Sequence, residues 1–391
     1  VSVALGSVAY IAAWTVASLA APEITGSASS SGLPSSVAVA GTALAAALLS
    51  GLMARRGRRI GIMAGIAVGL CGSAALAISI IVASFPLMLA GALALGFANS
   101  AVQLSRYAAA DLYPHGGQAS ALSFVVWGNT LGAVIGPNLV APAGSLGEAV
   151  GVSPFTSGFL LVVVLLLVAL GTATFGPRAP GEVEPVQPAS VRTPTRRLLA
   201  ELLRLPRGRT AVTALASVQL VMVLVMTMTP YHLHESGHGL GTVGFVLSAH
   251  TLGMFAFAPI SGRLTDRLGA LPMIMAGFAV LTSAGVLAAL LPTAAGSLLA
   301  IPLFLLGVGW NLGFVAGSSL LASGAPLSVR ARLQGATDAV VWSISALAGA
   351  ASGFVVELAG FSALSLVGAG AAALLAAVIA ADRRTLRSVE A

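Results

Sequence analysis

The stretch SGLMARRGRR, residues 50–59, places four arginines next to two long apolar segments. Neither segment, 34–54 on one side or 60–83 on the other, contains a charged side chain. A helix that crosses the hydrocarbon core of a bilayer needs about 20 mostly apolar residues, and both segments are long enough. The stretch therefore predicts a short basic turn between two membrane-spanning helices.

The composition extends this interpretation to the whole chain. Of its 391 residues, 57% are hydrophobic and 8% are charged. An average soluble domain has about 25% charged residues. Because so few charges cannot cover a water-facing surface of this size, most of the surface must face lipid. The single cysteine, Cys71, excludes an intramolecular disulfide and a metal site built from several cysteines.

Twelve segments are long and apolar enough to span a membrane. Residues 1–22 are interpreted as the first of them rather than as a cleaved signal, because no basic residue precedes the apolar run. We therefore expect an all-α membrane protein with 12 transmembrane helices. The segments are 1–22, 34–54, 60–83, 86–107, 118–140, 155–176, 209–231, 240–262, 271–291, 297–320, 333–356 and 361–381.

Every basic residue is an arginine, and all 19 lie at alternate loops or in the C-terminal tail. The charged residues of the other loops are glutamates: Glu23, Glu148, Glu235 and Glu357. Basic residues accumulate on the cytoplasmic side of membrane proteins, so both termini are predicted to be cytoplasmic. We expect a multi-pass protein of the cytoplasmic (inner) membrane. The same placement explains the formal charge of +7 without a nucleic-acid partner.

The two halves of the chain are related in sequence. Residues 50–57 align with residues 262–269, an offset of 212 positions. Several matches in chain order favour a duplication, and parallel six-helix repeats are a known plan of transporters. The further matches are Asn99 with Asn311, Pro114 with Pro326 and, after a small shift, residues 125–127 with 340–342.

A segment of different composition divides the halves. Residues 177–208 contain six prolines and several arginines, which predicts a flexible cytoplasmic linker. A short amphipathic helix around 195–204 within it can lie on the anionic leaflet. We therefore expect an N-terminal six-helix bundle at 1–176, the linker at 177–208 and a C-terminal six-helix bundle at 209–391.

These features resemble the major facilitator superfamily (MFS), whose signature between helices two and three is G-x-L-x-D-R-x-G-R-R. Residues 50–59 keep the leucine and three of the signature's basic positions, but have Ser50 for glycine and Ala54 for aspartate. The second-half loop, 262–269, keeps Asp266 but lacks the final arginines. The resemblance implies two pseudo-symmetric six-helix bundles around a central cavity.

In this family the signature loop implies a cytoplasmic latch. Asp266 should face the start of the helix at 118–140, since a helix N-terminus favours a carboxylate. The first half has alanine in its place, and Asp338 can supply an acid for Arg55 or Arg58 instead. A second interpretation is that the arginines reflect topology alone. The latch residues are Arg55, Gly57, Arg58, Arg59, Gly262, Asp266 and Arg267.

The helix at 118–140 contains Gly128, Gly132, Gly136 and Pro137 in G-x-x-x-G-x-x-x-G-P spacing. This looks like part of a motif of drug/proton antiporters, although the glycines that follow the proline there are absent. Glycines four apart form one smooth helix face, and proline permits a bend. Small-residue packing is an equal alternative. No equivalent Gly-Pro occurs in the helix at 333–356, and this asymmetry favours export.

Uncharged polar and aromatic residues lie in helices that the resemblance places around the cavity. Polar groups inside a membrane need partners from the protein or from a substrate. An aromatic and amide lining suits an uncharged or cationic organic molecule, whereas core packing is the alternative for the tryptophans. The cavity candidates are Trp14, Asn99, Gln103, Trp127, Asn129, Gln219, Trp310, Asn311 and Trp342.

Four of the five histidines fall between residues 232 and 250. His232, His234 and His238 suggest three alternatives: a divalent metal site, a proton-sensing outer gate, or ordinary loop histidines. His250 lies inside a predicted helix, where an ionisable residue is a functional candidate. We interpret His250 and Asp338 as the groups that couple transport to protons.

The sequence thus predicts a secondary active transporter that exports a small organic solute by alternating access, driven by protons. The alternatives are solute uptake, or export of a divalent metal or metallophore. An enzyme is not expected, since no Ser/His/Asp set, phosphate-binding loop, paired-carboxylate set or metal-protease spacing stands out. A non-transporting membrane sensor is not expected either, because it would need a sizeable soluble domain. We expect a monomer in the lipid bilayer, with protons and a small molecule as partners and no cofactor.

Overall fold

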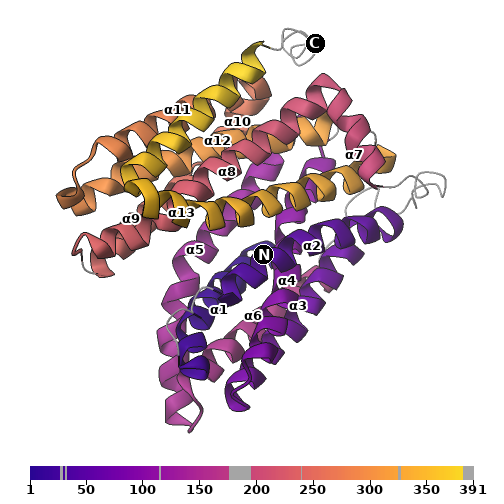
Figure 1. Cartoon of the computed structure of the whole chain (residues 1–391). Helices are drawn as coiled ribbons and strands as arrows, with labels where there is room; N and C mark the ends of the chain where they lie inside the picture. Colours follow the sequence, from indigo (N-terminus) through magenta and orange to yellow (C-terminus); the bar gives the residue numbers. More distant parts are fainter. Residues whose placement is uncertain are drawn as a thin grey trace. The chain divides into compact units, whose positions relative to one another are not determined.

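The computed structural model describes residues 1–26, 30, 33–113, 116–175, 195–238, 240–324 and 327–381. This part of the chain is helical and contains no strand. The α-helices are labelled in Figure 1: α1 Ser2–Thr25, α2 Leu33–Arg56, α3 Arg58–Ile81, α4 Phe85–Asp111, α5 Gln118–Ala149, α6 Pro154–Phe175, α7 Thr195–Arg204, α8 Pro206–Glu235, α9 Leu240–Phe255, α10 Ala258–Leu268, α11 Ala270–Leu290, α12 Ala300–Gly324 and α13 Leu327–Ala381. A 3-10 helix, η3 Thr293–Leu299, lies between α11 and α12 in the sequence.

The predicted spans are present, with two differences in how they are divided. Eleven helical stretches in the described part are long and apolar enough to cross a bilayer. The longest, Val329–Ala381, holds two predicted spans, because Gly360 (φ 80°, ψ 174°) interrupts the helix between them. This backbone conformation is open to glycine but strained for other residues. Counting both parts gives the 12 spans of the predicted all-α membrane fold.

The predicted span at 240–262 is formed by two helices instead of one. Helix α9 ends at Phe255 and α10 begins at Ala258, so two short helices together form the stretch Thr242–Leu268. Pro259 lies at the first positions of α10, where its missing N–H costs no helical hydrogen bond. The break is therefore compatible with a single membrane crossing.

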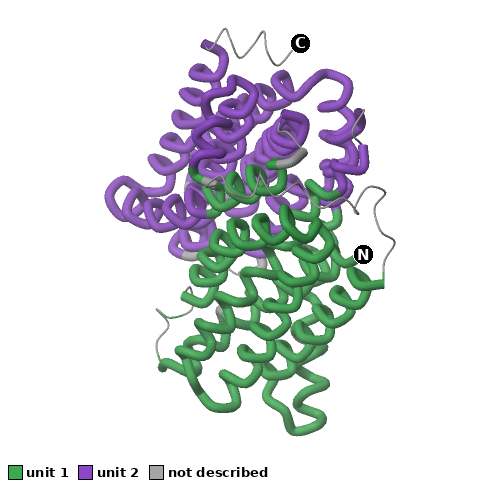
Figure 2. Tube along the Cα trace, turned by 90° about the vertical axis from the view of Figure 1, so that its right-hand side faces the viewer, with its two compact units in different colours: residues 1–108, 128–196, 326–342 green, residues 109–127, 197–325, 343–391 purple. Residues whose placement is uncertain are grey.

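The described chain forms two compact units, coloured in Figure 2. Unit 1 comprises residues 1–108, 128–196 and 326–342, and unit 2 comprises residues 109–127, 197–325 and 343–391. Each unit therefore includes a short segment from the other half of the sequence. The division at a linker 177–208 stays a prediction, and residues 176–194 lie outside the described part.

Equivalent helix crossings support the duplication. In unit 1, a Cβ at Gly65 would lie 2.9 Å from the backbone oxygen of Phe97. In unit 2, a Cβ at Gly277 would lie 2.9 Å from the backbone oxygen of Gly309. Both residues of the second crossing are offset by 212 positions from those of the first. Glycine lets the helix backbones approach this closely, as is common in membrane helix packing.

Candidate functional site

In unit 2, Asp266 at the end of α10 caps the start of α5. Its carboxylate oxygens accept hydrogen bonds from the backbone N–H groups of Ala119 (3.1 Å) and Ser120 (2.9 Å). The first N–H groups of a helix have no partner within the helix, and the helix dipole favours a negative charge there. The expected contact is therefore present, while the role of these residues as a latch stays a prediction.

One turn earlier, Gly262 sets how closely α10 approaches α5. A Cβ at Gly262 would lie 2.7 Å from the backbone oxygen of Ala119 and would collide with the Ser123 side chain. The glycine and the aspartate of the loop thus act on the same helix start. Gly262 permits close packing of α10 against α5, and Asp266 supplies a negative charge at the N-terminus of α5.

In unit 1 the glycine of this crossing is on the opposite helix. The loop position has Ser50, and a Cβ at Gly335 of α13 would collide with the Ser50 side chain and lie 2.5 Å from the backbone oxygen of Ala46. Ser50 is equivalent to Gly262, and Gly335 is equivalent to Ser123, both at the offset of 212. The two crossings therefore contain the same glycine–serine pair with the partners exchanged.

Unit 1 also contains a buried ion pair between distant parts of the sequence. Arg106 Nη2 on α4 lies 2.7 Å from Asp338 Oδ1 on α13, and both side chains are 2% exposed. Arg106 also donates to the Tyr107 hydroxyl (2.8 Å), and that hydroxyl donates to Asp338 Oδ1 (3.2 Å). Removing one partner of such a pair leaves a buried charge uncompensated.

Two further polar residues of α13, Gln334 and Thr337, are close to Asp338 in the sequence. Arg58 donates to the Gln334 side-chain oxygen, whereas Asp338 makes its direct ion pair with Arg106 rather than with Arg55 or Arg58. Among the described residues, Asp338 Oδ2 and Thr337 Oγ1 have no hydrogen-bond partner. Asp338 thus offers a buried oxygen that is available to a proton.

The ion pair has no counterpart in unit 2. The positions equivalent to Arg106 and Asp338 are Ser318 and Val126, and both are buried. The two units therefore differ in their charged contacts, which lie at positions that are not equivalent to one another. Unit 1 uses a side-chain ion pair, and unit 2 uses a carboxylate on a helix N-terminus.

The amides predicted to line the cavity have partners inside their own units. In unit 1, Asn99 donates to the Thr42 hydroxyl (3.2 Å), and Asn129 accepts from the Ser7 hydroxyl. These hydrogen bonds join helices and satisfy groups that lipid could not satisfy. Gln103 lies in the same unit, and its backbone oxygen accepts from Arg106.

The unit 2 amides are arranged in the same way. Gln219 accepts from the Trp310 indole N–H (2.8 Å) and donates to the Ser345 hydroxyl (2.9 Å). Asn311 accepts from the Ser261 hydroxyl and donates to the backbone oxygen of Met254 (2.6 Å). The structure thus supplies protein partners for these amides, and their contact with a substrate stays a prediction.

The four tryptophans differ in exposure. Trp310 is buried and stacks on Phe314 with ring centroids 4.3 Å apart, as core packing would require. Trp14 is 52% exposed and Trp127 is 44% exposed, so these two can contact lipid or a solute. Trp342 is half-buried.

The glycines of α5 lie against α1. A Cβ at Gly132 would lie 2.8 Å from the backbone carbon of Ser7, and one at Gly136 would lie 3.1 Å from the backbone oxygen of Val8. Gly128 is less crowded, with Val3 3.8 Å from its Cβ position. Small-residue packing therefore accounts for two of the glycines. Pro137 lies within α5, but its side chain is outside the described part.

His250 is buried in unit 2 between α9 and α12. Its Nδ1 lies 2.9 Å from the backbone oxygen of Leu303, so Nδ1 carries the hydrogen and donates it. Nε2 is buried and has no hydrogen-bond partner among the described residues. A neutral imidazole of this tautomer presents an unoccupied lone pair, which can accept a proton.

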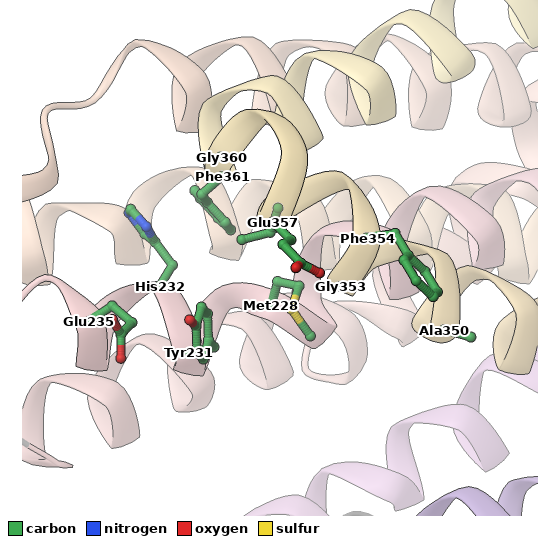
Figure 3. A pocket seen from close by; sticks show the side chains of 11 residues that line it. Met228, Tyr231, His232, Glu235, Ala350, Gly353, Phe354, Glu357, Gly360 and Phe361 are labelled. Carbon is green, nitrogen blue, oxygen red and sulfur yellow. The ribbon is translucent and has the colours of Figure 1, made fainter.

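His232 borders an open cavity of about 890 Å³ in unit 2 (Figure 3). His232 stacks on Phe361, with ring centroids 4.2 Å apart and planes 7° apart. Among the described residues, no three His, Cys, Asp or Glu side chains are grouped to hold a metal. The His234 side chain lies outside the described part, so its place in the histidine cluster stays a prediction.

Comparison with known proteins identifies the family. The family model of the Major Facilitator Superfamily matches residues 3–350 and, in a second match, residues 226–389. The chain belongs to the major facilitator superfamily. It is therefore a multi-pass secondary transporter of small molecules in a lipid bilayer, and not an enzyme.

Individual relatives agree with this family. The MFS-type transporter YddS of Bacillus subtilis, described as uncharacterized, is 33% identical over 93% of this chain and 85% of its own length. The riboflavin transporter RfnT of Brucella anthropi is 30% identical over 85% of this chain and 81% of its own. The crystal structure of the human organic anion transporter MFSD10 has a TM-score of 0.78 at 17% identity, covering 97% of this chain and 98% of that one.

Two residues of this MFS transporter's candidate site, Arg106 and Gly335, were not predicted from the sequence. A signal existed for Gly335, because the 212-residue offset pairs it with Ser123, which faces the signature glycine of the second half. Arg106 has only a serine as its counterpart, so the duplication gives no signal for it.

Proposed function

We propose that this transporter exports a small organic solute across the cytoplasmic membrane by alternating access, driven by proton entry. The observation that carries the proposal is the buried pair between Arg106 and Asp338. Intramembrane ionisable residues are costly and commonly mark proton or substrate pathways. The arginine distribution supports cytoplasmic termini, and we expect the transporter to act as a monomer.

The ion pair supplies a way to couple protons to movement. Alternating access moves the two sequence halves relative to one another, and α4 belongs to the first half while α13 belongs to the second. A proton on Asp338 removes the negative charge and leaves Arg106 buried without a counter-ion. Proton binding therefore favours the state in which these helices separate. His250 is the second proton-binding group of the proposal.

The substrate class follows from the exposed residues and from the relatives. Exposed Trp14 and Trp127 suit an organic molecule with an aromatic or apolar body. The proline and glycines of α5, which resemble the antiporter motif, favour export. The relationship to a riboflavin transporter supports a second candidate, transport of riboflavin or a similar flat heterocycle.

Transport by purified protein in proteoliposomes tests the proposal. With an imposed pH gradient, we expect uptake of an aromatic cation or riboflavin into inside-out vesicles, and no such flux without the gradient. Zn²⁺ and Ni²⁺ serve as probes of the metal alternative. Asp338→Asn should abolish the response to the gradient. If Asp338→Asn and His250→Ala both retain full gradient-driven transport, the coupling proposal fails.

A further inference from the structure

The cavity at the end of α8 has a lining that matches a specific kind of ligand. It lies entirely within unit 2, and its volume of about 890 Å³ is in the range of sites for drug-sized molecules. The last turns of α8 form one wall, and the part of α13 next to its break forms the other (Figure 3). Each wall contributes apolar, aromatic and acidic residues.

Aromatic rings form much of the lining. Tyr231 comes from α8, and Phe354 and Phe361 come from α13. Tyr231 and Phe354 are exposed, so their ring faces are accessible, whereas Phe361 is covered by the stacked His232 ring. An aromatic face attracts a cation through its quadrupole and packs against an apolar body.

Two carboxylates make the cavity electronegative. Glu235 of α8 and Glu357 of α13 belong to the lining, and neither has an ion-pair partner among the described residues. No arginine lines the cavity, and the loops predicted to be outside contain glutamates and histidines but no arginine. A concave site with one sign of charge raises the local concentration of ions of the opposite sign.

Glycines keep the cavity open. Gly353 and Gly360 are part of the lining, and a Cβ at either position would meet no heavy atom within 4 Å. Gly360 also ends the first helical part of α13. A larger side chain at Gly353 would fill the space between the walls without disturbing neighbouring backbone.

We propose that this cavity binds an organic cation with an aromatic or apolar body. A metal ion is disfavoured, since no three ligating side chains of the described residues are grouped there. The role of this site rests on the proposed function. The exported solute is then an organic cation, which passes this cavity on its outward path.

Binding of tetraphenylphosphonium to the purified full-length transporter in nanodiscs tests the site, measured by isothermal titration calorimetry. We expect the double variant Glu235→Gln/Glu357→Gln to bind it roughly tenfold more weakly than the wild type. Glu148→Gln is the matched control, since it removes an exposed glutamate of a predicted outer loop in unit 1 and should leave affinity unchanged. Gly353→Leu should weaken binding without changing the charge.

Equal affinity of the wild type and the double glutamine variant would overturn the site, as would equal weakening by Glu148→Gln. Equal binding of tetraphenylborate, which has the same shape and a negative charge, would do so too. The proposed function is judged separately by gradient-driven flux. Charge-dependent binding without proton-driven transport overturns the proposed function and leaves the site standing, whereas proton-driven transport with unaltered binding in the variants overturns the site alone.

Discussion

Arg106 and Asp338 lie 232 positions apart in the sequence, yet Nη2 of one is 2.7 Å from Oδ1 of the other in unit 1. The pair joins α4 to the beginning of α13, with Tyr107 bonded to both side chains. Taking two charges out of water is costly, and their attraction offsets that cost only when both partners are present. The pair therefore makes this helix contact dependent on the charge state of one carboxyl group.

The first prediction concerns that dependence. Asp338→Asn should lower the stability of the purified protein by about 3–5 kcal/mol, because Arg106 remains buried without its counter-ion. The double variant Arg106→Met/Asp338→Leu should recover most of that stability while remaining inactive in gradient-driven transport. Thermal unfolding in detergent and proteoliposome flux measure the two effects. Equal stability of the single and double variants would argue against a buried ion pair.

The second prediction concerns the exchanged glycine and serine. Gly335→Ser should cost about 1–3 kcal/mol, because the new side chain collides with Ser50. Adding Ser50→Gly should recover much of the loss, since it reproduces the arrangement of Gly262 and Ser123 in unit 2. Gly171→Ser in α6 is the control, because a Cβ there would meet nothing within 4 Å. Thermal unfolding of the wild type and the three variants measures these effects. If adding Ser50→Gly does not recover stability, the prediction is contradicted.

The third prediction concerns Asp266. Asp266→Asn keeps an oxygen acceptor but removes the charge at the start of α5, which should cost about 0.3–1 kcal/mol. Asp266→Ala also removes the hydrogen bonds to Ala119 and Ser120 and should cost more. Glu201→Gln is the control, since its ion pair with Arg197 is exposed. Hydrogen exchange of the α5 N-terminus should increase in the order Asn, then Ala, and an unchanged rate would contradict the cap.

The fourth prediction separates packing from substrate contact at Gln219. Gln219→Leu leaves the buried Trp310 N–H without its acceptor and should cost about 1–3 kcal/mol. The double variant Gln219→Leu/Trp310→Phe removes both polar groups and should be more stable than the single variant. If Gln219 acts in packing, its loss lowers the melting temperature with little change in KM for the solute. A raised KM at unchanged stability would instead support the predicted cavity role.

The fifth prediction concerns α7, where the sequence predicted an amphipathic helix at 195–204 and the structure has one at Thr195–Arg204. Leu198 and Leu202 of this helix are buried, while its arginines at 196, 197 and 204 are exposed. We expect the purified protein to be stabilised by phosphatidylglycerol relative to phosphatidylcholine, because an anionic headgroup attracts exposed arginines.

Replacing those three arginines by glutamine should abolish the preference. The matched control replaces Arg383, Arg384 and Arg387, which removes the same number of charges from the C-terminal tail. An equal loss of lipid preference in both variants would show a general charge effect rather than binding by α7.

The 12 spans followed from the sequence by itself, because apolar length is a local property that a bilayer requires of each helix. The contact of Asp266 with the start of α5 also followed, since the signature loop and a helix N-terminus are complementary in charge. The two spans of α13 also followed from the sequence, as two separate apolar segments. In the structure Gly360 alone interrupts the helix between them.

Other features were decided by the tertiary structure alone. The partner of Asp338, the crossing of Gly335 with Ser50 and the amide partners of Gln219 and Asn311 depend on how helices are rotated and aligned against one another. Membrane helices share nearly the same apolar composition on all sides, so hydropathy does not determine that rotation. Apolar length thus specifies which segments cross the membrane, and helix packing specifies which of their few polar groups meet.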